Sequence, residues 1–211
     1  MRYPIAASFI RQGRMILLGN PQGEAEIVET QGFAVALEKT KPIQNCLRVQ
    51  GVMASTTGTL VALNCIGRTT QGFVRVLQLD DVEDGSGGTK LRHEVITDFY
   101  DAMSMSKGSG LGWITFSWDN EYLIGTSGME AKHHISVWSL KSHNLMKMVT
   151  GDEAWGQQGK LPTLWHMVCC PYKAMIVTVG KDGKGYIWTK EYDENWACFA
   201  PGFEDLKENK E

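Results

Sequence analysis

The chain has 211 residues and a formal net charge of −3, and 43% of its residues are hydrophobic while 21% are charged. This balance is ordinary for a globular protein of about one domain. The overall charge gives no electrostatic signal for binding nucleic acid, but it does not exclude a local basic surface. The apolar runs are short and interrupted, so we expect no membrane-spanning segment, no secretory signal and no membrane partner.

The first half of the chain contains two units of short apolar strands separated by turns. In residues 5–30, turns at 11–13 and 21–23 divide three such strands, and the 23 glycines of the chain favour tight turns of this kind. A weaker copy of the unit has strands near 47–52, 60–64 and 73–77.

Residues 81–112 do not fit this pattern. They begin with a polar, glycine-rich stretch, "DVEDGSGGTK", continue through a segment compatible with a strand or a short helical turn, and return through "KGSGLG". We therefore expect the largest insertion of the chain here, on the surface and outside the sheets.

The second half of the chain repeats the unit twice more, with clearer strands. The third copy has a turn at 119–121 and strands at 113–116, 122–124 and 135–138. The fourth copy has an Asp-Gly hairpin turn at 181–183 and strands at 164–168, 175–179 and 186–188.

The spacing of these units predicts the fold. Matching third strands lie near Val28, Leu77, Trp138 and Trp188, close to the ~40–45 residues of a WD-repeat blade once loop insertions are added. The two tryptophans are each followed by a small hydroxyl residue, similar to the Trp-Asp pair that ends the third strand of such a blade. We predict an all-β fold, a WD-repeat β-propeller region of about four blades over residues 1–192. A β-sandwich also has spaced hairpins, but it need not repeat one unit.

No arrangement of residues predicts catalysis or metal binding. The 5 cysteines are odd in number and none forms a Cys-x-x-Cys pair, which favours reduced thiols in a cytosolic or nuclear protein. Cys169 and Cys170 are adjacent on a predicted strand and point to opposite faces, so they cannot both bind one metal. The glycine runs at 108–112 and 180–185 lack the Gly-Lys-Ser/Thr ending of a phosphate loop. We expect a binding or scaffolding protein and not an enzyme, with no cofactor and no metal.

The closing segment, residues 193–211, is aromatic for a chain end. Its "ENWACFAPGFEDL" stretch either folds back onto the domain or docks on another protein. The pattern closely resembles the segment that follows the last blade in the retinoblastoma-binding protein 5 family, the WD-repeat subunits of COMPASS and MLL-type histone H3 lysine 4 methyltransferase complexes. The matching residues are Glu194, Asn195, Trp196, Phe199, Ala200, Pro201, Phe203, Leu206, Glu208 and Asn209.

The resemblance continues upstream of this segment. "WDNEYLIGTSG" and "SHNLMKMVTG" are similar to stretches of the family's blades, and the likeness is strong after Trp113 and looser before it. The family propeller has seven blades, and this chain corresponds to the last four, so either earlier blades are absent from the sequence or the protein closes differently. The family tail also continues past the position of Glu211, into motifs for a SPRY-domain subunit and a second WD-repeat subunit.

The resemblance implies a non-catalytic scaffold in the nucleus whose tail stabilises a SET-domain methyltransferase. The implied contact residues are Phe199, Pro201, Phe203 and Leu206. Trp196 is the implied anchor of the tail on the last blade, and covering the edge of its own blade explains this residue equally well.

The family propeller also faces nucleosomal DNA with a row of arginines. A loose alignment puts Lys107 and Lys132 near two of these positions, and lysine can serve because phosphate contacts need little beyond a cation. Ordinary solvated lysines explain both residues equally well. The alternative function is a generic WD-repeat adaptor unrelated to chromatin, and the pattern of the closing segment argues against it.

Overall fold

The computed structural model describes residues 4–32, 34–37, 40, 42–68, 71–83, 89–100, 111–126, 134–150 and 164–189. These residues form fifteen β-strands and one short 3₁₀ turn at Arg11–Gly13. No helix in these ranges has the length and the apolar character that crossing a membrane requires.

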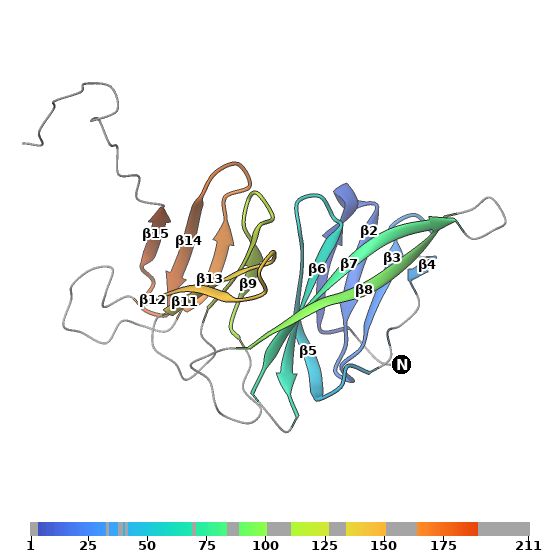
Figure 1. Ribbon diagram of the computed structural model, residues 1–211, viewed down its shortest axis with the longest axis horizontal. Coiled ribbons are helices and arrows are strands. Elements are labelled where there is room, and N and C mark those ends of the chain that lie inside the picture. The colour runs from blue at the N-terminus through green and yellow to red at the C-terminus, as the bar shows by residue number, and fades with distance from the viewer. Residues whose placement is uncertain are drawn as a thin grey trace, which may run out of the picture.

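The strands form four antiparallel sheets in chain order, which we call blades 1 to 4 (Figure 1). Blade 1 contains β1 (Ala6–Ile10), β2 (Met15–Gly19), β3 (Ala25–Glu29) and β4 (Val35–Leu37). Blade 2 contains β5 (Cys46–Ala54), β6 (Leu60–Gly67), β7 (Phe73–Glu83) and β8 (Thr89–Tyr100). Blade 3 contains β9 (Ile114–Phe116), β10 (Tyr122–Thr126), β11 (His134–Ser139) and β12 (Leu145–Thr150). Blade 4 contains β13 (Leu164–Cys169), β14 (Met175–Gly180) and β15 (Gly185–Thr189).

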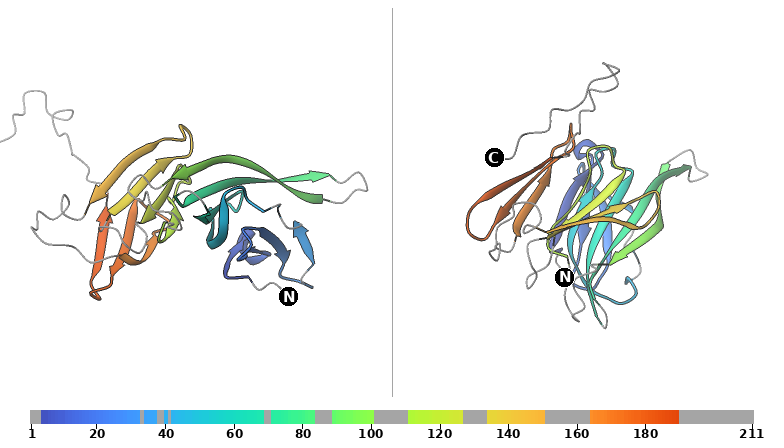
Figure 2. Two further views of the ribbon diagram at one scale, coloured as in Figure 1. Left: turned by 90° about the horizontal axis from the view of Figure 1, so that it is seen from below. Right: turned by 60° about the vertical axis from the view of Figure 1, so that its left-hand side comes forward.

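The first strand of each blade is the innermost one. β1 contacts β5, β5 contacts β9 and β9 contacts β13, so the first strands of neighbouring blades lie close together. From these strands each blade runs outward in the order of the sequence, and blades 1 and 4 lie at opposite ends of the molecule (Figures 1 and 2). This stacking of meanders is the arrangement of a β-propeller.

Apolar layers between the blades form the core. Blade 2 and blade 3 bury both faces of their inner strands. Residues 61–67 of β6 and 123–126 of β10 are buried without interruption. In β1 and β15 the exposure alternates along the strand, because blades 1 and 4 have one neighbour each. The three layers contain, in chain order, Leu17 and Leu63, Val76 and Leu123, and Ile124 and Met167.

The predicted β-propeller strands are confirmed, and the predicted insertion is wrong in its central part. β7 continues to Glu83, and β8 pairs with it along Thr89–Tyr100 as the long outer hairpin of blade 2 (Figure 1). Within β8, Leu91 and Phe99 are buried in two different apolar layers. An outer strand exposes many of its positions and therefore contains many polar residues. Its sequence lacks the apolar pattern by which the inner strands were recognised.

The turns of neighbouring blades also contact one another. Gly58, in the turn between β5 and β6, has a φ of +72°, and a Cβ there would lie 2.8 Å from the backbone nitrogen of Arg11 in blade 1. The left-handed backbone and the contact both disfavour a side chain at this position. Gly183, in the turn between β14 and β15, has a φ of +79° but nothing within 4 Å of such a Cβ.

We predict that Gly58→Ala destabilises the fold more than Gly183→Ala does. Both variants carry the cost of a left-handed alanine, about 1–2 kcal/mol. Only Gly58→Ala also pushes blade 1 away from blade 2, which adds about 1–3 kcal/mol. Urea unfolding of the two variants measures the difference, and equal losses of stability would contradict the role of this contact.

Candidate interaction surface

Aromatic side chains gather where the inner strands of blades 3 and 4 meet. The ring of Trp113, just before β9, lies 4.2 Å from the His166 ring of β13, at an angle of 49°. The Trp113 indole Nε1 donates a hydrogen bond to the Trp165 carbonyl oxygen. Lys181 Nζ lies 5.8 Å from the centre of the Trp165 ring, within reach of a cation–π contact. We call Trp113, Trp165, His166 and Lys181 the aromatic cluster.

Hydrogen bonds between side chains and the backbone hold the entry to blade 3 in place. Asn64, which is buried in blade 2, donates through Nδ2 to the Leu111 carbonyl at 2.9 Å and to the Gly112 carbonyl at 3.2 Å. Thr126 accepts a hydrogen bond from the Trp113 backbone nitrogen at 2.9 Å. Because these bonds fix the backbone before β9, Trp113 has little freedom to lose when a partner binds.

The aromatic cluster has the chemistry of a binding surface. Trp165 is 63% exposed although it lies in a strand, and Trp113 is also exposed. Large aromatic side chains with fixed positions and a cation at their edge are the usual anchors of protein interfaces. We therefore regard the cluster as the candidate interaction surface of the described residues.

The sequence analysis missed this cluster, although it contained a signal for it. Trp113 and Trp165 are 52 residues apart, and each lies at the beginning of the first predicted strand of its unit. In a propeller the first strands of neighbouring blades adjoin, so equivalent positions in two repeats become neighbours.

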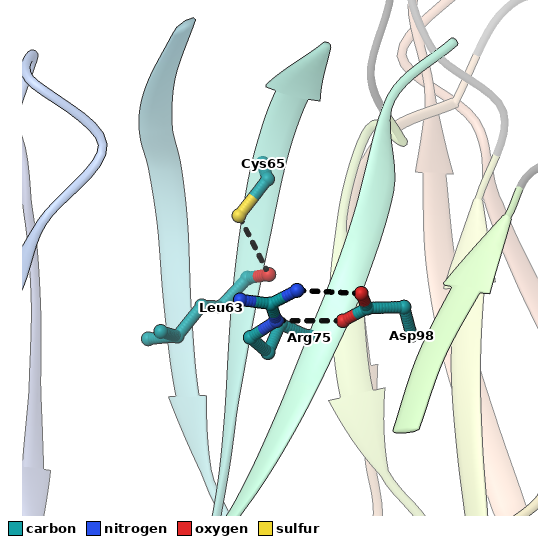
Figure 3. A network of polar contacts seen from close by, with 4 residues as sticks. All are labelled: Leu63, Cys65, Arg75 and Asp98. Atoms are coloured by element: carbon teal, nitrogen blue, oxygen red, sulfur yellow. Dashed lines mark hydrogen bonds and ion pairs between the residues drawn. The ribbon is translucent and has the colours of Figure 1, made fainter. Parts of the chain in front are cut away.

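A second polar network lies in the outer half of blade 2 (Figure 3). Arg75 and Asp98 are cross-strand neighbours on β7 and β8 and form a two-pronged ion pair, with 2.8 Å from Nε to Oδ1 and 2.6 Å from Nη2 to Oδ2. The Arg75 guanidinium also lies 5.7 Å from the centre of the Phe73 ring. The hydrogen bonds that Arg75 donates to Asp98 raise the pKa of Arg75. The pair is satisfied within its own blade, so its role is to fix the outer hairpin.

Cys65, beside this network, and Cys169, in blade 4, are poor candidates for nucleophiles. A hydrogen bond with Cys46, together with burial, raises the pKa of Cys65, and the Cys65 thiol also donates to the Leu63 carbonyl at 3.5 Å (Figure 3). Burial likewise raises the pKa of Cys169. A protonated thiol is a weak nucleophile and a weak metal ligand. Within the described ranges, no three His, Cys, Asp or Glu side chains are placed to hold a metal ion.

Every site residue expected from the sequence lies outside the described residues, so the structure does not test these expectations. These expectations therefore stay predictions. They concern the tail residues Trp196, Phe199, Pro201, Phe203 and Leu206, and the two cations Lys107 and Lys132.

Comparison with known proteins gives three informative relatives. The chain is 28% identical over 231 residues to Protein RBL of Arabidopsis thaliana, covering 99% of this chain and 39% of that protein. It is 25% identical to the retinoblastoma-binding protein 5 homolog of Drosophila melanogaster, covering 98% of this chain and 39% of that protein. It is 29% identical to the Set1 complex component swd1 of Schizosaccharomyces pombe, covering 69% of this chain and 32% of that protein. No family model matches the chain.

The structural comparison identifies the fold independently. The crystal structure of the Cps50 (Swd1) β-propeller domain from Myceliophteria thermophila matches 90% of this chain and 55% of that chain, with a TM-score of 0.69 and 16% sequence identity. The chain spans about two fifths of the length of the curated relatives that match it along nearly all of its sequence. The four sheets are therefore blades of a β-propeller, and the chain is a homologue of the RBL, retinoblastoma-binding protein 5 and Swd1 proteins.

Proposed function

We propose that this chain is a non-catalytic scaffold subunit of a Set1/COMPASS-type complex that methylates histone H3 lysine 4 in the nucleus. The observation that carries the proposal is the match along 98% of the chain to a retinoblastoma-binding protein 5 homolog, supported by the match to a Set1 complex component. The chain spans only part of these relatives, so the partners named below belong to the same proposal.

The described surface supports a scaffold role. The aromatic cluster offers exposed anchors on a rigid backbone, and the neighbouring polar groups are engaged in hydrogen bonds within and between blades. Such a surface holds partners in a fixed orientation and supplies no reacting group.

The partners follow from the resemblance. The proposed direct partner is a SET-domain methyltransferase, bound by the tail residues Phe199, Pro201 and Phe203. A SPRY-domain subunit and a second WD-repeat subunit are proposed as members of the same complex. The nucleosome is the proposed substrate of the complex. Lys107 and Lys132 are the proposed contacts with the phosphates of its DNA.

We predict that Trp165→Ala weakens assembly of the complex and leaves the fold intact. An aromatic anchor of this kind is worth about 2 kcal/mol on truncation, or roughly thirtyfold in affinity. Binding to an immobilised reconstituted complex, measured beside a thermal melt, tests the prediction. Tyr172→Ala is the matched control, because Tyr172 is an exposed aromatic residue in the turn between β13 and β14, outside the cluster. If the two variants bind the complex with equal affinity, the cluster is not part of the interface.

We predict that Phe203→Ala lowers histone H3 lysine 4 methylation by the complete complex. Loss of an aromatic anchor on the SET domain costs about 2–4 kcal/mol, which is roughly a thirtyfold to several-hundredfold loss of affinity. The melting temperature of the propeller should stay nearly unchanged, because a terminal peptide adds little to the core. Trp196→Ala should instead lower the melting temperature of the last blade.

Two results would contradict this role of Phe203. Full methylation by the complex that contains the variant would show that Phe203 does not contact the SET domain. Lost methylation with an equally large drop in melting temperature would make Phe203 part of the core of its own domain.

We predict that replacing both Lys107 and Lys132 by Glu weakens nucleosome binding and flattens its salt dependence. Phosphate contacts release counterions, so the slope of log affinity against log salt should fall by about 1–2 with no change in preference between DNA sequences. Titrations at several salt concentrations measure this slope. Unchanged affinity for the nucleosome at low salt would show that both are ordinary solvated lysines that do not contact DNA.

A further inference from the structure

The outer edges of the blades are protected unequally. A strand at the edge of a sheet presents unpaired backbone donors and acceptors, and proteins protect such edges with short strands or charged side chains. The outer strands of blades 1 to 3 are β4, β8 and β12 (Figure 1). β4 has only 3 residues. β8 has charged side chains along its length, namely Lys90, Arg92, Glu94 and Asp98. β12 is longer than β4 and has one charged residue, Lys147.

β12 exposes apolar side chains at its free edge. Leu145 is 41% exposed and Met146 is 58% exposed. Among the described residues, β12 pairs only with β11. Blade 3 packs on blade 2 through one face and on blade 4 through the other, so the edge of β12 lies on the outer rim of the propeller. An exposed apolar edge of this kind is a ready template for another strand.

The charge beside this edge is positive. Residues 139–150, which contain β12 and the turn before it, include Lys141 and Lys147 and no acidic residue. Lys147 forms no ion pair with any described residue. Its cross-strand neighbour is Val137, which packs in the layer between blades 3 and 4. A carboxylate on an added strand could therefore lie opposite Lys147 without meeting a like charge on β12.

We propose that β12 binds an extended peptide of another protein as a fifth strand of blade 3, and that this peptide alternates apolar and acidic residues. Main-chain hydrogen bonds to β12 supply affinity, and the alternate side chains supply specificity. Successive side chains of a strand point to opposite faces, so a carboxylate opposite Lys147 places its two neighbours beside Met146 and Met148. Apolar residues at those two positions cover the exposed part of β12.

The positive charge is the reason for choosing a partner and not a second copy. Pairing of β12 with itself would bring two positive edges together, whereas an acidic peptide complements the charge. This binding mode is separate from the aromatic cluster, which lies at the inner strands of blades 3 and 4. It goes beyond the proposed function, because it does not depend on the complex to which the chain belongs.

Fluorescence polarisation with labelled synthetic peptides tests the proposal on the purified 211-residue chain. The probe is the peptide Ser-Val-Glu-Val-Glu-Val-Ser, and the control peptide has Lys in place of each Glu. The acidic peptide should bind saturably and at least about tenfold more tightly than the lysine peptide. Lys147→Glu should reverse this order, and the reversal also shows that the variant is folded. Lys90→Glu is the matched control and should leave the order unchanged, because Lys90 is an exposed lysine on the outer strand of blade 2.

Hydrogen exchange locates the bound peptide. The acidic peptide should slow the exchange of amide hydrogens in β12 and leave those of β8 and of the aromatic cluster unchanged. The same peptide with alternate amides N-methylated should not bind, because it cannot pair along one edge. Failure of the acidic peptide to bind, equal binding by the lysine or the methylated peptide, or protection outside β12 would each overturn the proposal. Protection of β12 through dimerisation of the free chain would assign the edge to a second copy and would overturn it as well.

Discussion

Blades 2 and 3 each have two apolar faces, and a neighbouring blade packs on each face. The constraint is visible along a single strand, β10, where Leu123 faces blade 2 and the next residue, Ile124, faces blade 4. Successive side chains of a strand point to opposite faces, so a strand that is buried on both sides has to be apolar at consecutive positions. The order of the blades and their spacing follow from this requirement.

The same stacking produces the candidate interaction surface. Face-to-face packing brings the first strands of neighbouring blades together, so residues at equivalent places in two repeats become neighbours. Trp113 and His166 meet in this way, while the buried amide of Asn64 fixes the backbone that carries Trp113. The surface is thus formed by blades 3 and 4 and supported by blade 2, and no single blade contains it.

The strands of this protein could be predicted from the sequence because each inner strand is short, apolar and bounded by a turn. The Asp-Gly hairpin turn before β15 and the tryptophans on β11 and β15 were sufficient to set the repeat. β8 could be predicted only as a strand or a short helical turn outside the sheets, because exposure along an outer strand mixes Leu91 and Phe99 with many charged residues. The aromatic cluster could be found only by superimposing the repeats, since no local pattern relates Trp113 to Trp165. The tail residues rest on a family resemblance, because a short aromatic peptide does not specify its partner by physical chemistry alone.

The meander within each blade has a further consequence for how the molecule opens. Each strand pairs with its neighbour in sequence, so most backbone hydrogen bonds close short loops and lie within one blade. Proteins built this way behave as a chain of coupled units, in which the terminal units separate first. Amide hydrogens of β2 and β14 should therefore exchange with solvent by local opening of an end blade. Those of β6 and β10, which are enclosed on both sides, should exchange only when the whole domain unfolds.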